Sequence, residues 1–165
     1  MLYAILVTTL VALDQLVKYL VRIQIPLHGS VPFLPHLVEL TYVQNTGAAF
    51  SLFSQHTWLL AVVSALASLL LAAILIKGVV RHPFGRLSIA VVLAGAVGNL
   101  IDRVCLGYVV DMFKLLFMNF AIFNVADICV VCGGIAAAVY FIFFYDKWEQ
   151  KSGGEDAHGT HPADR

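Results

Sequence analysis

The stretch "FNVADICVV", from Phe123 to Val131, opens a long apolar run and carries one carboxylate, Asp127. Burying an unpaired carboxylate in hydrocarbon costs several kcal/mol. No Lys or Arg lies within one helical turn on either side of Asp127. A carboxylate in such a setting is typical of a functional site, so Asp127 is the first candidate site residue.

The composition is that of a membrane protein. Of the 165 residues, 61% are hydrophobic and 12% are charged, whereas a soluble domain is usually about 45–50% apolar and about 25% charged. Ten basic and ten acidic residues leave no formal net charge, which argues against a nucleic acid partner. His and Cys are not grouped with carboxylates at ligand spacing, so neither a metal nor another cofactor is predicted.

Four stretches are long enough to cross a bilayer as helices, which takes roughly 20 residues each. They cover approximately residues 2–21, 57–76, 87–106 and 125–145. Three basic residues gather in the short loop after the second stretch, whereas residues 23–56 contain no Lys or Arg. Because basic loops stay in the cytoplasm, both termini are predicted to be cytoplasmic.

The outer loop "VPFLPHLVELTYVQNTGAAF", residues 31–50, is rich in β-branched and apolar residues and ends in a turn signal. It predicts a small strand-containing element at the outer face of the bilayer. Residues 152–165 are polar and predict a disordered cytoplasmic tail beside one membrane-embedded domain, residues 1–151. The predicted fold is an all-α membrane protein, a four-transmembrane-helix bundle with a small extracytoplasmic β-containing element.

Polar residues interrupt the apolar stretches at a few places. Asp14 and Lys18 share one helix face at i, i+4 spacing and form either a self-neutralising ion pair or a site in which Lys18 acts as a general base. Asp102 is followed directly by Arg103, its nearest candidate partner in sequence. Asp111 lies just past the third stretch, where a solvated loop carboxylate and a functional residue are equally compatible with the pattern.

These polar groups agree in depth, because the predicted topology brings all of them to the outer membrane face. They come from four separate segments and comprise Asp14, Lys18, Asn99, Asp102, Arg103, Asp111 and Asp127. Two carboxylates a few ångströms apart share one proton, and aspartic proteases use such a pair to activate water and polarise a carbonyl. Asp111 and Asp127 are the best candidates for this pair because neither has an obvious local cation, Lys114 sharing a side with Asp111 only if that segment were helical.

Five ordered motifs surround the four stretches: "DQLVK", "NTGAAF", "AGAVGNLIDR", "YVVDMF" and "FNVAD". Together they closely resemble the lipoprotein signal peptidase family, the bacterial type II signal peptidases, over nearly the whole chain except the tail. The resemblance implies an intramembrane aspartyl endopeptidase of the bacterial inner membrane. Such an enzyme removes the signal peptide of a prolipoprotein by cleaving just before a cysteine that carries diacylglyceryl.

Carried over by motif, the catalytic pair falls on Asp111 and Asp127. The supporting or substrate-binding residues of the family fall on Asp14, Lys18, Asn45, Gly95, Asn99, Arg103 and Asn124. The resemblance also implies an outer β-cradle, a mobile periplasmic helix, a monomeric enzyme in contact with membrane lipids, and a site that the family inhibitor globomycin occupies. Met112 and Ala94 depart from the residues common in the family, which concerns only the shape of the pocket.

Other protein classes explain the pattern less well. A Ser/Lys protease would use Lys18, but Asp14 would keep it charged, and Ser51 and Ser54 fit a loop. A transporter with a proton relay would place carboxylates near the bilayer midplane, and the cytoplasmic halves of the four stretches lack acidic groups. A scaffold protein would leave Asp127 unexplained.

Overall fold

The computed structural model of the chain describes residues 1–47 and 57–145. The predicted tail, residues 152–165, lies outside this range, as do residues 48–56 with Ser51 and Ser54. The described residues form four long helices, α1 (Leu2–Gln24), α2 (Thr57–Lys77), α3 (Pro83–Cys105) and α4 (Val125–Phe143). All four are long and apolar enough to cross a membrane, which confirms the predicted four-helix membrane bundle.

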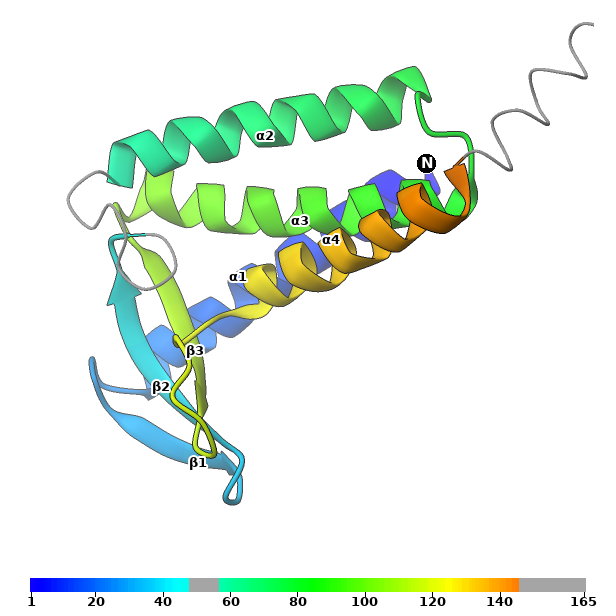
Figure 1. Ribbon diagram of the computed structural model, residues 1–165. Coiled ribbons are helices and arrows are strands. Elements are labelled where there is room, and N and C mark those ends of the chain that lie inside the picture. The colour runs from blue at the N-terminus through cyan, green and yellow to red at the C-terminus, as the bar shows by residue number, and fades with distance from the viewer. Residues whose placement is uncertain (48–56, 146–165) are drawn as a thin grey trace, which may run out of the picture.

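Helix α3 is the centre of the bundle. It packs against α1, α2 and α4, and Figure 1 shows it running between α2 and the other two helices. In its most apolar part 50% of the residues are buried, against 6% in α2. Helix α2 therefore lies on the outside of the bundle with many of its apolar side chains exposed, while α3 carries the close helix contacts.

The largest boundary difference concerns the start of α3, which begins at residue 83 rather than at the predicted 87. Pro83 stands in the first turn, where its missing N–H is not needed. The side chain of His82 accepts a hydrogen bond from the Phe84 N–H at 3.2 Å. These two residues start the helix before Arg86 and place that basic residue inside it.

A three-stranded antiparallel sheet lies at one end of the bundle (Figure 1). Its strands are β1 (Ser30–Leu34), β2 (Val38–Asn45) and β3 (Val109–Leu115), in that order across the sheet. The first two strands lie in the loop where the sequence predicts a β element. The third was not predicted, and it places Asp111 opposite Val43. Since Asp111 is only 2% exposed, its interpretation as a solvated loop carboxylate is wrong.

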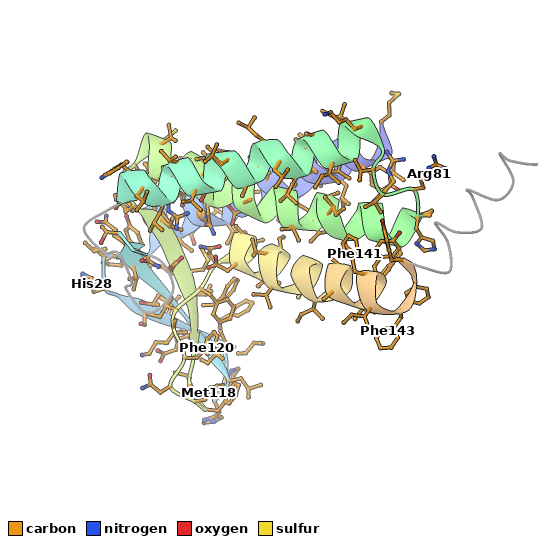
Figure 2. The ribbon with its side chains drawn as sticks, turned by 45° about the horizontal axis from the view of Figure 1, so that its top comes forward. His28, Arg81, Met118, Phe120, Phe141 and Phe143 are labelled. Carbon is orange, nitrogen blue, oxygen red and sulfur yellow. The ribbon has the colours of Figure 1, made fainter. Side chains whose placement is uncertain are left out.

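The two ends of the bundle differ in character. The N-terminal end of α1 and the C-terminal end of α4 lie together, opposite the sheet (Figure 1). In Figure 2, Arg81 of the basic loop lies at the same end as Phe141 and Phe143, whereas Phe120 lies at the sheet end. The polar residues singled out in the sequence belong to the sheet end, where α1 and α3 finish and α4 begins.

Candidate active site

Asp127 is the third residue of α4, and its carboxylate is part of the cap of that helix. The Asn124 side chain accepts a hydrogen bond from the Asp127 N–H at 2.9 Å. In return, Oδ2 of Asp127 accepts one from the Asn124 N–H at 3.1 Å. This reciprocal capping box satisfies two main-chain donors that a helix N-terminus leaves unpaired. The carboxylate that opens the apolar run therefore has partners despite the lack of a nearby cation in sequence.

Asp111 comes from β3 and meets the same asparagine. The Asn124 side-chain amide donates to its Oδ1 at 2.7 Å, and the Asn45 side-chain amide donates to its Oδ2 at 2.8 Å. Asn45 is the last residue of β2 and pairs with Val109 on β3, the strand that carries Asp111. The sheet therefore delivers both the carboxylate and one of its donors.

Asn99 of α3 completes the connection between the two aspartates. Its amide group donates to Oδ1 of Asp127 at 2.8 Å, and its oxygen accepts from the Asn124 amide at 3.1 Å. All four oxygens of Asp111 and Asp127 thus accept hydrogen bonds from uncharged amides. Neutral donors stabilise the pair without fixing its charge, which suits two carboxylates that share one proton.

Burial raises the pKa of the Asp111 carboxyl to about 6, from an ordinary value of 3.8. The amide of Asn45 opposes this rise in pKa, the negative charge of Asp127 adds to it, and Asn124 and Lys18 oppose it further. A carboxyl group with this pKa changes its charge close to neutral pH, which is the property that acid–base chemistry needs.

Lys18 forms a second cluster behind the aspartate pair. Its ammonium group lies 2.9 Å from Asp14 Oδ2 and 3.1 Å from Asp102 Oδ2, and it donates to Asn99 Oδ1 at 3.0 Å. The predicted Asp14–Lys18 pair is present, and Asp102 pairs with Lys18, so its expected pairing with Arg103 is wrong. Three acceptors occupy the three N–H groups of the ammonium, which leaves Lys18 unsuited to act as a general base.

Gln15, Gly95 and Gly98 also help this cluster to form. Gln15 was not among the predicted site residues. Its amide donates to Asp102 Oδ1 at 2.9 Å and to Gly98 O at 3.1 Å. A Cβ at Gly98 would lie 2.6 Å from Asp14 Oδ2, and one at Gly95 would lie 2.3 Å from Ala126 O. The glycines therefore permit α1 and α4 to approach α3 at the level of the site. Gln15 was detectable as a polar residue beside Asp14 in an apolar stretch.

Arg103 and both aspartates line a cavity of about 420 Å³. The Arg103 guanidinium makes only long contacts, to Asn99 O at 3.4 Å and Gly47 O at 3.5 Å. Within the described part of the chain, its buried Nε has no hydrogen-bond partner. The remaining cavity wall is mostly apolar and includes Val109, Phe120, Ile122, Phe123, Ile128, Val130 and Val131.

A second cavity of about 360 Å³ meets the first at Asn45 and Asp111. Its wall is more polar and includes Gln44, Thr46 and Asn119. All nine candidate residues therefore gather at the sheet end. They are the aspartates Asp111 and Asp127, the asparagines Asn45, Asn99 and Asn124, the Asp14–Lys18 pair, Arg103 and the contact glycine Gly95. Among the described residues, no group of three or more His, Cys, Asp or Glu could hold a metal ion.

The fold and the site define a multi-pass membrane protein with paired carboxylates beside an apolar cavity at one end of its bundle. Known proteins share this architecture. One solved structure, described as a bacterial membrane enzyme, matches with a TM-score of 0.80 and 25% identity, over 99% of this chain and 93% of that one. A second bacterial membrane enzyme matches with a TM-score of 0.78 and 28% identity, over 86% and 93% of the two chains.

Sequence relatives and a family profile agree. The lipoprotein signal peptidase of Enterococcus faecalis is 40% identical over 159 residues, which is 96% of each chain. That of Streptococcus pneumoniae is 44% identical over 132 residues, covering 80% of this chain and 86% of the relative. The profile of the family described as signal peptidase (SPase) II matches residues 6–144. The chain belongs to the signal peptidase II family and is a membrane-embedded peptidase.

Proposed function

We propose that this peptidase is an aspartyl endopeptidase that removes signal peptides from diacylglyceryl-modified prolipoproteins and cleaves just before the lipidated cysteine. The observation that carries the catalytic part is that Asp111 and Asp127 both accept hydrogen bonds from Asn124 at the wall of one cavity. The substrate class rests on the lipoprotein signal peptidases to which the chain is similar.

In the proposed reaction the pair carries one proton in total. The ionised carboxylate takes a proton from water, and the resulting hydroxide attacks the scissile carbonyl carbon. The protonated carboxyl donates a hydrogen bond to the carbonyl oxygen as negative charge develops there. Collapse of the tetrahedral intermediate breaks the C–N bond, and a proton from the pair goes to the leaving amine. The three asparagines keep both carboxylates in place while their charge alternates.

The walls of the two cavities suit the two sides of such a substrate. We assign the larger, mostly apolar cavity to the apolar signal segment and the diacylglyceryl group, and the more polar one to the main chain that follows the cysteine. We assign Arg103, which lines the larger cavity, to bind a substrate carbonyl. All residues invoked come from one chain, so we expect a monomeric enzyme, with globomycin as a ligand of the same cavity.

The proposal is tested by giving the purified protein two forms of one precursor, with and without diacylglyceryl on the cysteine. We expect the lipidated form to be shortened, with the modified cysteine as the new N-terminal residue by mass spectrometry. The unmodified form should be cleaved far more slowly, because it cannot fill the apolar cavity. Equal cleavage of both forms, or cleavage elsewhere in the chain, would contradict the proposed substrate class.

We further propose that the protein lies in the bacterial inner membrane with the sheet end outward. Lys77 ends α2, Arg81 lies in the connection that follows and Arg86 lies in the first turn of α3, at the end of the bundle opposite the sheet. Basic connections of this kind stay in the cytoplasm. The N-terminal end of α1 and the C-terminal end of α4 would then be cytoplasmic. Reporter fusions after Lys77 are expected to report the cytoplasm and fusions at Gly29 the outside. A cytoplasmic signal at Gly29 would reverse the orientation.

A further inference from the structure

Two buried carboxylates outside the catalytic pair hold the main chain directly beside it. Oδ1 of Asp14 accepts a hydrogen bond from the Ala126 N–H at 2.8 Å, and Oδ2 of Asp102 accepts one from the Val110 N–H at 2.9 Å. Ala126 immediately precedes Asp127, and Val110 immediately precedes Asp111. The same kind of contact is therefore repeated one residue before each catalytic aspartate.

Both contacts join a main-chain donor of one element to a carboxylate of another. Ala126 is the second residue of α4, so its N–H has no acceptor within the helix. Asp14 of α1 supplies that acceptor across the helix interface. The Val110 N–H turns toward Asp102 of α3, although Val110 pairs with Gln44 in the register of the sheet. Asp14 thus joins α1 to α4, and Asp102 joins α3 to β3, where α4 and β3 each carry one residue of the catalytic pair.

Lys18 joins the two contacts into one unit. Its ammonium group lies between the carboxylates of Asp14 and Asp102 and also binds Asn99, which in turn donates to Asp127. Lys18 is 2% exposed, Asp14 is 1% and Asp102 is 2%. Hydrogen bonds to charged groups in such surroundings are strong and well directed, so this unit constrains the placement of both main-chain segments.

We infer that Asp14 and Asp102 are positioning residues, which hold the amides before Asp127 and Asp111 so that the ion cluster around Lys18 sets the placement of the two catalytic carboxylates. The inference rests on the proposed acid–base role of Asp111 and Asp127. A carboxylate pair must be held closely, because a misplacement of about 1 Å can cost about 100-fold in rate. Asp102 itself takes up and releases no proton in the reaction.

The closing experiment compares Asp102→Asn with Asp102→Ala. The Asn side chain keeps an oxygen that can accept the Val110 N–H, whereas Ala removes it. We expect Asp102→Ala to lower kcat by about 100-fold with little change in KM, and Asp102→Asn to stay within about tenfold of the wild type. Asp14→Ala should likewise lower kcat more than Asp14→Asn, because only the Asn side chain keeps an oxygen that can accept the Ala126 N–H. Ser68→Ala is the matched control, since it removes a buried side-chain hydrogen bond in α2, to Ser64 O at 2.7 Å, and should leave kcat unchanged.

A second measurement separates positioning from general stability. Hydrogen–deuterium exchange should quicken at Val110 in Asp102→Ala and at Ala126 in Asp14→Ala, each without the other. Loss of activity in Asp102→Asn as complete as in Asp111→Asn would overturn the inference, because Asp102 would then be a titrating catalytic group. A normal kcat in Asp102→Ala would overturn it as well. If the wild type left the lipidated precursor intact, the proposed function would fail, and the local exchange rates would still decide whether the two carboxylates hold these amides.

Discussion

Asp111→Asn and Asp127→Asn are each expected to lower the turnover of a lipidated precursor by about 1,000-fold. Each substitution keeps the shape of the side chain but removes a group that can gain and lose a proton. The double variant should be little worse than either single variant, because residues that act as a unit show strongly non-additive effects. Turnover is measured on each variant after its membrane insertion has been confirmed.

Glu39→Gln is the matched control for these substitutions. Glu39 lies on β2 and pairs with Lys114 at 3.2 Å on the exposed part of the same sheet. The substitution removes a carboxylate that does not contact the aspartate pair, so the turnover of this variant should stay close to the wild-type value. Near-normal turnover in Asp127→Asn would require a different catalytic pair, with Asp102 the first replacement to test.

The pH dependence of kcat/KM gives the pair a second signature. Because the pKa of Asp111 is raised to about 6, this carboxyl holds its proton below that pH and loses it above. If Asp111 is the proton donor of the pair, kcat/KM of the free enzyme should fall as the pH rises through about 6. A value that instead rises through this range would assign the role of base to Asp111 and that of acid to Asp127.

The helices were predictable because each one is a local property of the sequence. A run of about 20 apolar residues specifies a membrane helix without reference to the rest of the chain. The main boundary error, at the start of α3, arose from giving weight to the basic residue Arg86. Pro83 after His82 is a local signal for a helix start, so this boundary was within reach of the sequence.

Strand β3 and the partner of Asp102 were harder to predict because both depend on contacts distant in sequence. The short segment around Asp111 becomes a strand by pairing with β2, which lies about 70 residues earlier in the sequence. Strand formation depends on such neighbours more than on local propensity. Arg103 adjoins Asp102 in sequence, but consecutive helical residues point in different directions. Lys18, on another helix, lies 3.1 Å from Asp102. Sequence motifs supplied the candidate site residues, whereas the hydrogen bonds that connect them required the fold.

Lys18→Met is expected to destabilise the protein by roughly 3–5 kcal/mol, the usual effect of removing one partner from a buried ion pair. Met has a similar length, so packing changes little, but Asp14 and Asp102 lose the cation that contacts both of them. The substitution is measured as a fall in the midpoint of thermal unfolding in lipid or detergent. Lys114→Met is the control, because its pair with Glu39 is largely exposed and such pairs contribute about 0–1 kcal/mol.

Removing the carboxylate charges that Lys18→Met leaves without a cation should restore part of the stability lost in that variant. Adding Asp102→Asn to Lys18→Met leaves one uncompensated carboxylate, and adding Asp14→Asn as well leaves none. Each step is therefore expected to raise the unfolding midpoint, although the single Asp substitutions lower it in the presence of Lys18. This reversal of sign is the mark of direct coupling between neighbours. Additive effects of the three substitutions would mean that the charge of Lys18 does not hold the two carboxylates, and the positioning role of the cluster would lose its physical basis.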